Sequence, residues 1–323
     1  MDLTKNGSTK GPTDRRAHPL FRCMEKNLDA APAPAVACRP HRPEATTRCA
    51  PVPARSDARW IEMVVSLDDA RVVVPASRQE AIDAFGDGVD VVVGGATILQ
   101  PEITAGRVRP GRALFLHRAG LDELRHDGDR VRVGATTTLE TIAASGVEPL
   151  ARAAGHIGDP EIRRQATLGG NVSAVGEGDL QAVLLALEAS VRTVGPSGER
   201  TEGVDAFLRR FGGDEERLLL EAEFTVPEAA GYAVMDRFHT IPYTPLAVTA
   251  VRSDGVTRVA AKGAAPQSGR LPSVETALSA GASPEEAAAE AVADADPYDD
   301  ALASAWYRRR RLPQLVTQAL TEL

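Results

Sequence analysis

Cysteine is scarce in this 323-residue chain and confined to its beginning, where Cys23, Cys38 and Cys49 stand 15 and 11 residues apart. These spacings match no common metal-binding motif. From residue 50 onward the sequence has no cysteine, so this stretch offers no thiolate ligand for an iron–sulfur cluster or a zinc ion and forms no disulfide. If the chain takes part in redox chemistry, its electrons must therefore reside on an organic cofactor.

Long apolar runs are missing as well. No stretch of 18 apolar residues is present, so no membrane-spanning helix is predicted. The first 62 residues lack the apolar core of a secretory signal, and Arg15–Arg16 are not followed by the apolar stretch of a twin-arginine signal. We therefore expect a cytoplasmic location. No metal site is predicted, because paired spacing typical of zinc ligands is not found among His117, His126, His156 and His239.

Residues 1–62 differ in composition from the rest of the chain. They hold 8 of the 22 prolines and 11 Lys+Arg against 7 Asp+Glu, whereas the remaining residues carry a net charge of −12. A stretch with so little hydrophobic periodicity cannot bury enough apolar surface to offset its chain entropy. We expect residues 1–62 to be a disordered extension or the product of a misassigned start codon, with the folded part beginning at Met63.

Two common phosphate-binding motifs are absent, namely the dinucleotide fingerprint G-x-G-x-x-G and the P-loop G-x-x-x-x-G-K-[ST]. The chain has two separate glycine pairs in their place. The first pair, Gly94–Gly95, follows the β-branched run Val91–Val93 and precedes the small residues Ala96 and Thr97. A strand that ends in such a turn lets main-chain N–H groups approach a phosphate.

The second pair, Gly169–Gly170, lies in the stretch Ile162–Asp179, which we interpret as a loop wrapped around an anion. Paired glycines allow positive φ angles and a close approach of the backbone. Asp179 precedes the apolar run Leu180–Leu187, so it could cap a helix there or accept hydrogen bonds from ligand hydroxyls. Because the two pairs are about 75 residues apart, they indicate an extended ligand with two phosphates that spans two subdomains.

Hydrophobic periodicity and turn residues predict the remaining elements. The first part is typical of a β–α–β unit, with strands at 72–74 and 89–93, a helix at 77–85 capped by Ser77, and loops at 101–105 and 109–111. Next come strands at 113–116 and 130–133 around a turn at 126–129, helices at 139–144, 149–154 and 180–187, and strands at 190–194 and 218–226. From about Gly231 we expect strands at 232–239, 246–252 and 257–263, then helices at 274–280, 283–293 and 301–323, the second with a capping box at Ser283.

Three segments follow one another in a specific order, namely VVVGGATILQPEI, IRRQATLGGN and GDLQAVLLALEA. With them the chain resembles, from about Met63 to its end, the FAD-binding medium subunit of molybdenum hydroxylases of the carbon monoxide dehydrogenase and xanthine dehydrogenase type. The central motif is I-R-x-x-x-T-[IL]-G-G-N, followed eight residues later by Asp. The resemblance implies an α+β fold with an FAD-binding PCMH-type domain over 63–228 and a C-terminal domain over 229–323. The first domain would consist of two α/β subdomains, 63–115 and 116–228, and the second of an antiparallel sheet with helices.

The resemblance also implies which residues contact FAD. The two glycine pairs would surround the phosphates and the flavin, and Asp179 would bind hydroxyl groups. Arg237 precedes Phe238 where the family has a lysine, so it would keep a positive charge near the flavin. Because the first glycine loop contains no histidine, we expect FAD to be bound non-covalently. No catalytic residue is predicted, and the complete predicted contact set is Val93, Gly94, Gly95, Ala96, Thr97, Ile98, Ile157, Thr167, Leu168, Gly169, Gly170, Asn171, Asp179, Leu220 and Arg237.

The function implied by the resemblance is that of an oxidoreductase subunit that transfers electrons. It would take them from the [2Fe–2S] clusters of a small partner subunit and pass them through FAD to a terminal acceptor, while a molybdopterin-binding large subunit oxidises the substrate. Two alternatives stay open, a stand-alone non-covalent FAD oxidoreductase and a cofactor-free assembly subunit. The basic run Arg308–Arg311 does not indicate nucleic-acid binding, because the chain around it is acidic, and we expect it to be a solvated or interface face.

Overall fold

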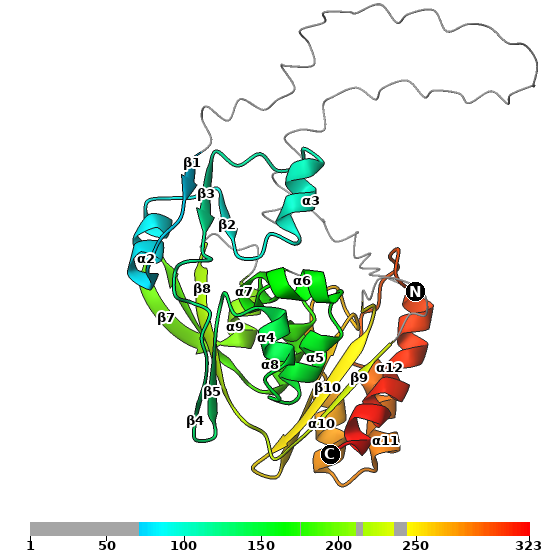
Figure 1. The fold of residues 1–323 in the computed structure, drawn as a ribbon. Helices are drawn as coiled ribbons and strands as arrows, with labels where there is room; N and C mark the ends of the chain where they lie inside the picture. Colours follow the sequence, from blue (N-terminus) through cyan, green and yellow to red (C-terminus); the bar gives the residue numbers. More distant parts are fainter. Residues whose placement is uncertain (1–70, 175, 211–215, 236–243) are drawn as a thin grey trace, which may run out of the picture. The chain divides into compact units, whose positions relative to one another are not determined.

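The computed structural model describes residues 71–174, 176–210, 216–235 and 244–323 (Figure 1). The predicted extension over 1–62 and the predicted contact residue Arg237 lie outside the described residues. From Val72 onward the chain belongs to one unit. In the part of the chain that is described, no helix has both the length and the apolar content needed to cross a lipid bilayer.

The chain begins with a small three-stranded sheet whose order is β1-β3-β2, with β1 at Arg71–Val73, β2 at Val91–Val93 and β3 at Arg112–Phe115. Helix α2 (Arg78–Gly86) connects β1 to β2 and begins at its predicted cap, where Ser77 Oγ accepts the Glu80 N–H at 3.2 Å. The predicted strand–helix–strand sequence is confirmed, although β3 lies between the two strands. The loop predicted at 101–105 is wrong, because α3 (Leu99–Thr104) is helical there.

A second sheet of five strands has the order β4-β5-β8-β6-β7. Its strands are β4 (Leu124–Asp127), β5 (Arg130–Gly134), β6 (Ser190–Gly195), β7 (Gly198–Gly203) and β8 (Leu218–Thr225). Sequence patterns missed β4 and β7. Both strands are polar and largely exposed, so they lack the apolar alternation that identifies a half-buried strand.

Six helices of this first part of the chain are α4 (Leu139–Ala143), α5 (Leu150–Gly155), α6 (Pro160–Gln165), α7 (Leu168–Val172), α8 (Leu180–Ala186) and α9 (Val204–Arg209). The continuous loop predicted over Ile162–Asp179 is therefore wrong where α6 and α7 form. All seven residues of α8 are buried. A helix that is apolar on every side needs protein around its whole circumference.

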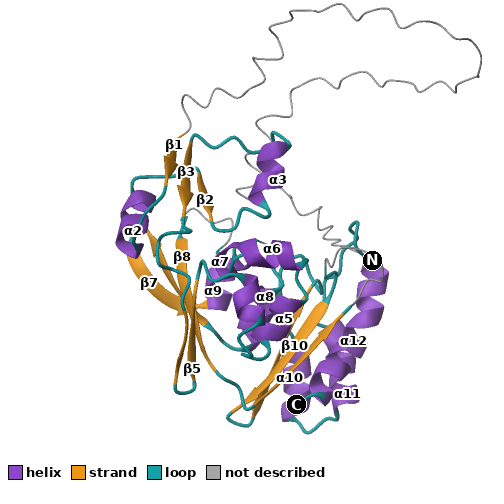
Figure 2. Ribbon diagram, viewed as in Figure 1, coloured by secondary structure: helices purple, strands orange, loops and turns teal. Residues whose placement is uncertain are grey.

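The third sheet supplies part of that surrounding. It is antiparallel, with the order β12-β11-β10-β9, and consists of β9 (Ala229–Val234), β10 (Ala247–Ser253), β11 (Val256–Lys262) and β12 (Gly269–Arg270). One face packs on α8, and the other is covered by α10 (Pro272–Ser279), α11 (Pro284–Ala289), the short 3₁₀ helix η3 (Glu290–Val292) and α12 (Ala305–Thr321). Figures 1 and 2 show α5 and α8 between β8 and β10, with α12 beyond the third sheet.

Alternation along β10 explains why this sheet has two covered faces. Ala247 and Val251 belong to the core cluster that contains α8, whereas Val248 and Ala250 belong to the cluster that contains α12. Neighbouring strand residues point to opposite faces, so an almost fully apolar strand requires cover on both sides. The predicted capping box of α11 is confirmed, with Ser283 and Glu286 exchanging side-chain and main-chain hydrogen bonds.

Candidate functional site

The first glycine pair lies against the segment that precedes the second pair, although the two are far apart in the sequence. A Cβ atom on Gly95 would be 1.7 Å from the carbonyl oxygen of Gln165, and one on Gly94 would be 2.6 Å from Thr167 Oγ1. Gln165 and Thr167 lie four and two residues before the second pair. The loop after β2 therefore touches the segment that joins α6 to α7, and only glycine leaves room for this contact.

Close approach, and not a left-handed backbone, is the reason for glycine at Gly94, Gly95 and Gly169, where a Cβ would come within 3.0 Å of a neighbouring atom. None of Gly94, Gly95, Gly169 and Gly170 has a positive φ, so that part of the prediction is wrong. The left-handed residue of the loop is Ala96, with a φ of 57°. A residue with a side chain in this region stores about 1–3 kcal/mol of strain, which is typical of ligand-binding turns.

The main-chain N–H groups of this turn are available to a ligand. Within the described residues, the five N–H groups from Gly94 to Ile98 have no hydrogen-bond acceptor. All of these residues except Ile98 are half-buried. Successive N–H groups in a turn form a concavity that binds anions, and burying them without an acceptor is unfavourable. The turn therefore fits the oxygen atoms of a phosphate group.

The second glycine pair has a different part in the site, because its N–H groups are already paired. Gly169 N–H donates to the Ala135 carbonyl at 2.8 Å, and Gly170 N–H donates to Thr167 Oγ1 at 3.2 Å. Thr167 thereby caps helix α7. Since a Cβ on Gly169 would be 2.9 Å from the Ala135 oxygen, this glycine lets α7 pack closely on the end of β5.

Asp179 lies at the start of α8 but does not cap it with its side chain. The Leu180 N–H donates instead to Asn171 Oδ1 at 2.9 Å, so the side-chain capping that we considered for Asp179 is wrong. The Asp179 carboxylate accepts a hydrogen bond from Lys262 Nζ at 2.9 Å. Both side chains are buried, with exposed fractions of 9% for Asp179 and 10% for Lys262.

Sequence patterns missed Lys262, which comes from the end of β11 and lies 83 residues beyond its partner. One signal was present in the composition. Lys262 is the only lysine after Lys26, and all other basic residues in that stretch are arginines. The chain therefore has a compact ammonium group at one buried position, whereas its other cationic side chains after Lys26 carry the larger, planar guanidinium group.

Arg163 of the central motif fixes the position of Ile157. Its guanidinium donates to the carbonyls of Gly155, Ile157 and Gly158 at 3.2, 3.4 and 3.2 Å. It also pairs with Glu140 at 2.9 Å. Ile157 itself is half-buried and packs against the main core. This arginine therefore holds the segment that precedes α6, and its role is structural.

Leu220 is fully buried on β8, and its backbone leads to the second glycine pair. Ala135 N–H donates to the Leu220 carbonyl at 2.9 Å, and the Ala135 carbonyl in turn accepts the Gly169 N–H at 2.8 Å. Main-chain hydrogen bonds through Ala135 thus connect Leu220 to Gly169. Val93 is the last residue of β2 and leads directly into the loop after this strand. Contact of Ile157 and Leu220 with a cofactor stays a prediction.

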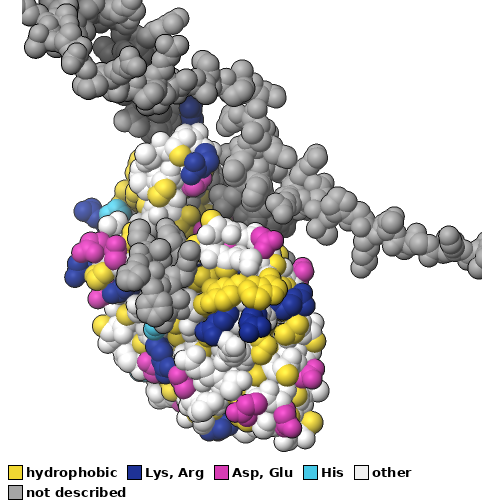
Figure 3. All heavy atoms as spheres, turned by 90° about the vertical axis from the view of Figure 1, so that its right-hand side faces the viewer, with side chains coloured by type: hydrophobic (Ala, Val, Ile, Leu, Met, Phe, Trp, Pro, Cys, Tyr) yellow, Lys and Arg dark blue, Asp and Glu magenta, His cyan; other side chains and the backbone are white. Residues whose placement is uncertain are grey.

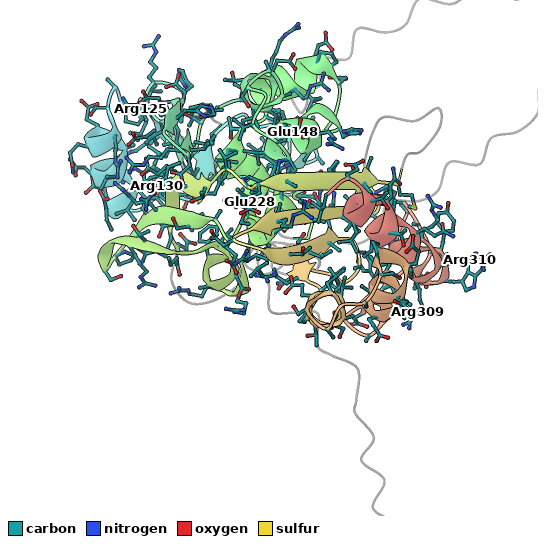
Figure 4. The ribbon with its side chains drawn as sticks, turned by 90° about the horizontal axis from the view of Figure 1, so that it is seen from below. Arg125, Arg130, Glu148, Glu228, Arg309 and Arg310 are labelled. Atoms are coloured by element: carbon teal, nitrogen blue, oxygen red, sulfur yellow. The ribbon has the colours of Figure 1, made fainter. Side chains whose placement is uncertain are left out.

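The basic run on α12 has one buried residue, two exposed residues and one half-buried residue. Arg308 is only 1% exposed, so the expected solvated face is wrong for this residue. It donates to the carbonyls of Pro245 and Gly263, pairs with Asp300 at 2.6 Å and lies over the Tyr298 ring. Arg309 and Arg310 project away from the helix (Figure 4). Basic and apolar side chains adjoin on this side of the molecule (Figure 3).

A hollow of about 300 Å³ lies at the other end of α8, and none of the described residues that line it belongs to the predicted site. Glu188 in its wall pairs with Arg258 at 2.7 Å and with Arg270 at 2.9 Å. Burial would raise the pKa of Glu188, but the hydrogen bonds from the two arginines outweigh it and hold that pKa below its usual value. Four of the five charged residues that line the hollow, namely Arg130, Glu188, Glu223 and Arg258, are therefore already paired. Among the described residues, no group of three or more His, Cys, Asp or Glu side chains is arranged for a metal ion.

Comparison with known sequences points to flavin-binding proteins. A family model for the FAD binding domain in molybdopterin dehydrogenase matches residues 68–228. The nicotine 6-hydroxylase medium subunit of Paenarthrobacter nicotinovorans is 30% identical over 283 residues, which cover 80% of this chain and 98% of that protein. The carbon monoxide dehydrogenase medium chain of Hydrogenophaga pseudoflava is 29% identical over 273 residues, covering 76% and 94%.

Comparison with solved structures points to the same group of enzymes. Carbon monoxide dehydrogenase from Hydrogenophaga pseudoflava lacking the Mo-pyranopterin moiety has a chain with a TM-score of 0.70 and 26% identity, covering 78% of this chain and 96% of that one. Quinoline 2-oxidoreductase from Pseudomonas putida 86 shares the fold, with a TM-score of 0.70, 19% identity and the same coverage. The α+β PCMH-type fold that the resemblance implied is thereby confirmed.

Proposed function

Because the chain belongs to the family of FAD-binding medium subunits of molybdenum hydroxylases, we propose that it works as the electron-transfer subunit of such a complex. Membership of this family identifies the chain as an FAD-binding oxidoreductase subunit. In the proposed role, the subunit receives electrons from the [2Fe–2S] clusters of a small partner subunit and passes them through FAD to a terminal acceptor. Oxidation of the substrate belongs to a molybdopterin-binding large subunit.

One observation supports this function most strongly, namely the turn of unpaired N–H groups from Gly94 to Ile98 beside the second glycine pair. We assign the N–H groups of this turn to the pyrophosphate of FAD, because main-chain donors bind phosphates without a cationic side chain. Asp179 is assigned to hydroxyl groups of the ligand, since a carboxylate accepts charge-assisted hydrogen bonds. The remaining predicted contacts, including Arg237, stay in the proposed set.

FAD, when bound, supplies a redox centre that accepts one or two electrons. The protein residues hold and orient this group. No histidine occurs in the loop from Gly94 to Ile98, which supports non-covalent attachment. Asp179 and Lys262 provide a carboxylate and an ammonium group in a part of the site with little access for water.

The proposed partners follow from the relatives and from the composition. The relatives are subunits of larger enzyme complexes, as the names of the nicotine 6-hydroxylase medium subunit and the carbon monoxide dehydrogenase medium chain state. Residues 50–323 contain no cysteine, so thiolate-bound clusters would belong to another subunit. We also propose a cytoplasmic location and a boundary between the FAD-binding and C-terminal domains near residues 228–229.

The experiment is purification of the full chain followed by absorption spectroscopy before and after denaturation. We expect a flavin spectrum that copurifies with the folded protein and is released into the filtrate when the protein unfolds. Colour that stays with the denatured polypeptide would contradict non-covalent attachment. A colourless protein that takes up no added FAD would favour the cofactor-free alternative, and substrate oxidation without partner subunits would favour a stand-alone oxidoreductase.

A further inference from the structure

Helix α8 is connected to strand β11 by an ion pair at each end. At its beginning Asp179 pairs with Lys262 at 2.9 Å, and just beyond its end Glu188 pairs with Arg258 at 2.7 Å. The second pair is exposed on one side, since the Glu188 side chain is 51% exposed. The first pair is almost completely buried. The same helix and strand therefore carry one ion pair inside the protein and one near its surface.

Stability alone does not explain the buried pair. Taking two charges out of water is costly, and a buried ion pair is often no more stable than apolar residues of the same size. The cost is offset only when the remaining donors and acceptors find partners. An ammonium group has three donors and a carboxylate has four acceptor positions, yet among the described residues the pair makes one hydrogen bond, the one between its own members. The remaining capacity fits a polar ligand.

The backbone on both sides holds this pair in place. Gly263 follows Lys262, and its carbonyl accepts a hydrogen bond from Arg308 Nη1 at 3.2 Å. The loop before Asp179 rests on the segment after β11, because a Cβ on Gly176 would lie 2.7 Å from the Pro266 carbonyl oxygen. Two segments that are far apart in the sequence thus meet where the carboxylate and the ammonium group lie.

From this geometry, and resting on the proposed function, we infer that Lys262 is a positioning residue for FAD. It holds the Asp179 carboxylate in place and compensates its charge, so that the carboxylate accepts hydrogen bonds from the hydroxyl groups of the ligand. The affinity for FAD then depends on a residue of the C-terminal sheet. Without Lys262, a buried carboxylate would have no charge partner and no fixed direction.

The test compares Lys262→Met with Arg258→Met in the full chain. Both changes remove an ion pair between β11 and the ends of α8, but only the first one touches Asp179. After removal of FAD, its dissociation constant is measured by flavin fluorescence, and the thermal midpoint of each FAD-free protein is recorded. We expect Lys262→Met to weaken FAD binding about 10- to 100-fold, the effect of losing a well-placed hydrogen bond to a charged group. Arg258→Met should stay within about twofold of the unaltered chain.

Lys262→Met leaves a buried carboxylate unpaired and could therefore unfold the protein. The double variant Asp179→Asn with Lys262→Met removes both charges and avoids this difficulty. If Lys262 acts through Asp179, the double variant binds FAD as weakly as Asp179→Asn alone, because nothing is left to position. A second readout uses reductive methylation and peptide mass spectrometry at Lys262, whose modification by the reagent should be slower with FAD than without it.

Equal FAD affinity of Lys262→Met and Arg258→Met would overturn the inference, as would a methylation rate at Lys262 that FAD does not change. A double variant that binds much more weakly than Asp179→Asn would also overturn it, since Lys262 would then act independently of that carboxylate. These results would leave the proposed function intact. If the unaltered chain takes up no FAD, the proposed function fails together with the inference.

Discussion

Replacing Gly95 by alanine is the most direct test of the contact between the loop after β2 and the segment that precedes the second glycine pair. The new Cβ would lie 1.7 Å from the Gln165 carbonyl oxygen, 2.4 Å from its carbonyl carbon and 2.9 Å from the Ala166 Cα. Carbon atoms in contact sit roughly 3.5–4.0 Å apart, so the loop and the segment before α7 must separate by about 1.5 Å or more. Neighbours that are backbone atoms cannot avoid the clash by changing a rotamer.

The expected cost is about 1–3 kcal/mol, the range for overpacking, and it falls on the contact that places the unpaired N–H groups beside the second glycine pair. If that free energy is lost from the bound state, FAD binds roughly 5- to 150-fold more weakly. The assay is flavin retention after gel filtration, followed by titration with FAD. Thermal unfolding of the FAD-free protein shows whether the clash also destabilises the fold.

Gly86→Ala is the matched control, because a Cβ at this position would meet nothing within 4 Å. It adds the same methyl group at the end of α2, and we expect a midpoint and an FAD affinity close to those of the unaltered chain. For Gly170→Ala we expect an effect on FAD affinity between those of the other two variants, because its Cβ would be 3.2 Å from Thr167 Oγ1, a side-chain atom that can move. Equal FAD affinity of Gly95→Ala and Gly86→Ala would refute a role in FAD binding for the contact between Gly95 and Gln165.

Three further changes test other parts of the structure. Thr167→Ala removes the cap of α7 and should lower the free energy of unfolding by about 1 kcal/mol, measured by urea denaturation, with Ser283→Ala as a comparison at a cap far from the site. Arg308→Met leaves Asp300 and two carbonyls without their donor and should destabilise the chain by about 3–5 kcal/mol, whereas the exposed Arg309→Met should change it by less than about 0.5 kcal/mol. The pKa of Glu188 is held below its usual value, so the Glu188 carboxylate stabilises the folded state above the unfolded pKa of about 4.5, and this contribution is lost as the pH falls through the folded value. Glu188→Gln should therefore lower the thermal midpoint at pH 7 and show a shallower decrease below pH 4.5, and a decrease as steep as that of the unaltered chain would contradict this assignment.

Local sequence signals were sufficient for elements whose stabilising contacts lie within a few residues. Ser77 and Ser283 cap the helices that they were predicted to cap, and the apolar run at 180–187 forms a buried helix. The signals failed where a strand has no apolar face, as in β4 and β7. They also failed for α6 and α7. Glycines lower the helix propensity of α7, which is capped by Thr167. Helix α6 contains good helix formers but spans only six residues, too few to show a helical period, and is capped by Asp159.

The sequence proposes the candidate site as a set of residues but does not give their arrangement. Both glycine pairs were evident from composition, yet the contact of Gly95 with Gln165 depends on how two distant segments fold together. Nothing in the sequence distinguishes the free N–H groups of Gly94–Gly95 from the paired N–H groups of Gly169–Gly170. The pairing of Lys262 with Asp179 was unpredictable for the same reason, since the two residues are 83 positions apart and on different elements.

Helix α8 has a consequence for how the chain can be divided. Its side chains share one continuous apolar cluster with residues of the third sheet, among them Ala247, Val251 and Ala260. Cleavage near residue 228 would separate this helix from the third sheet and expose apolar surface on both fragments. We therefore expect the two fragments to precipitate when produced separately and to regain solubility when they are produced together, so that the limits of the recognised flavin module are not the limits of an autonomous folding unit.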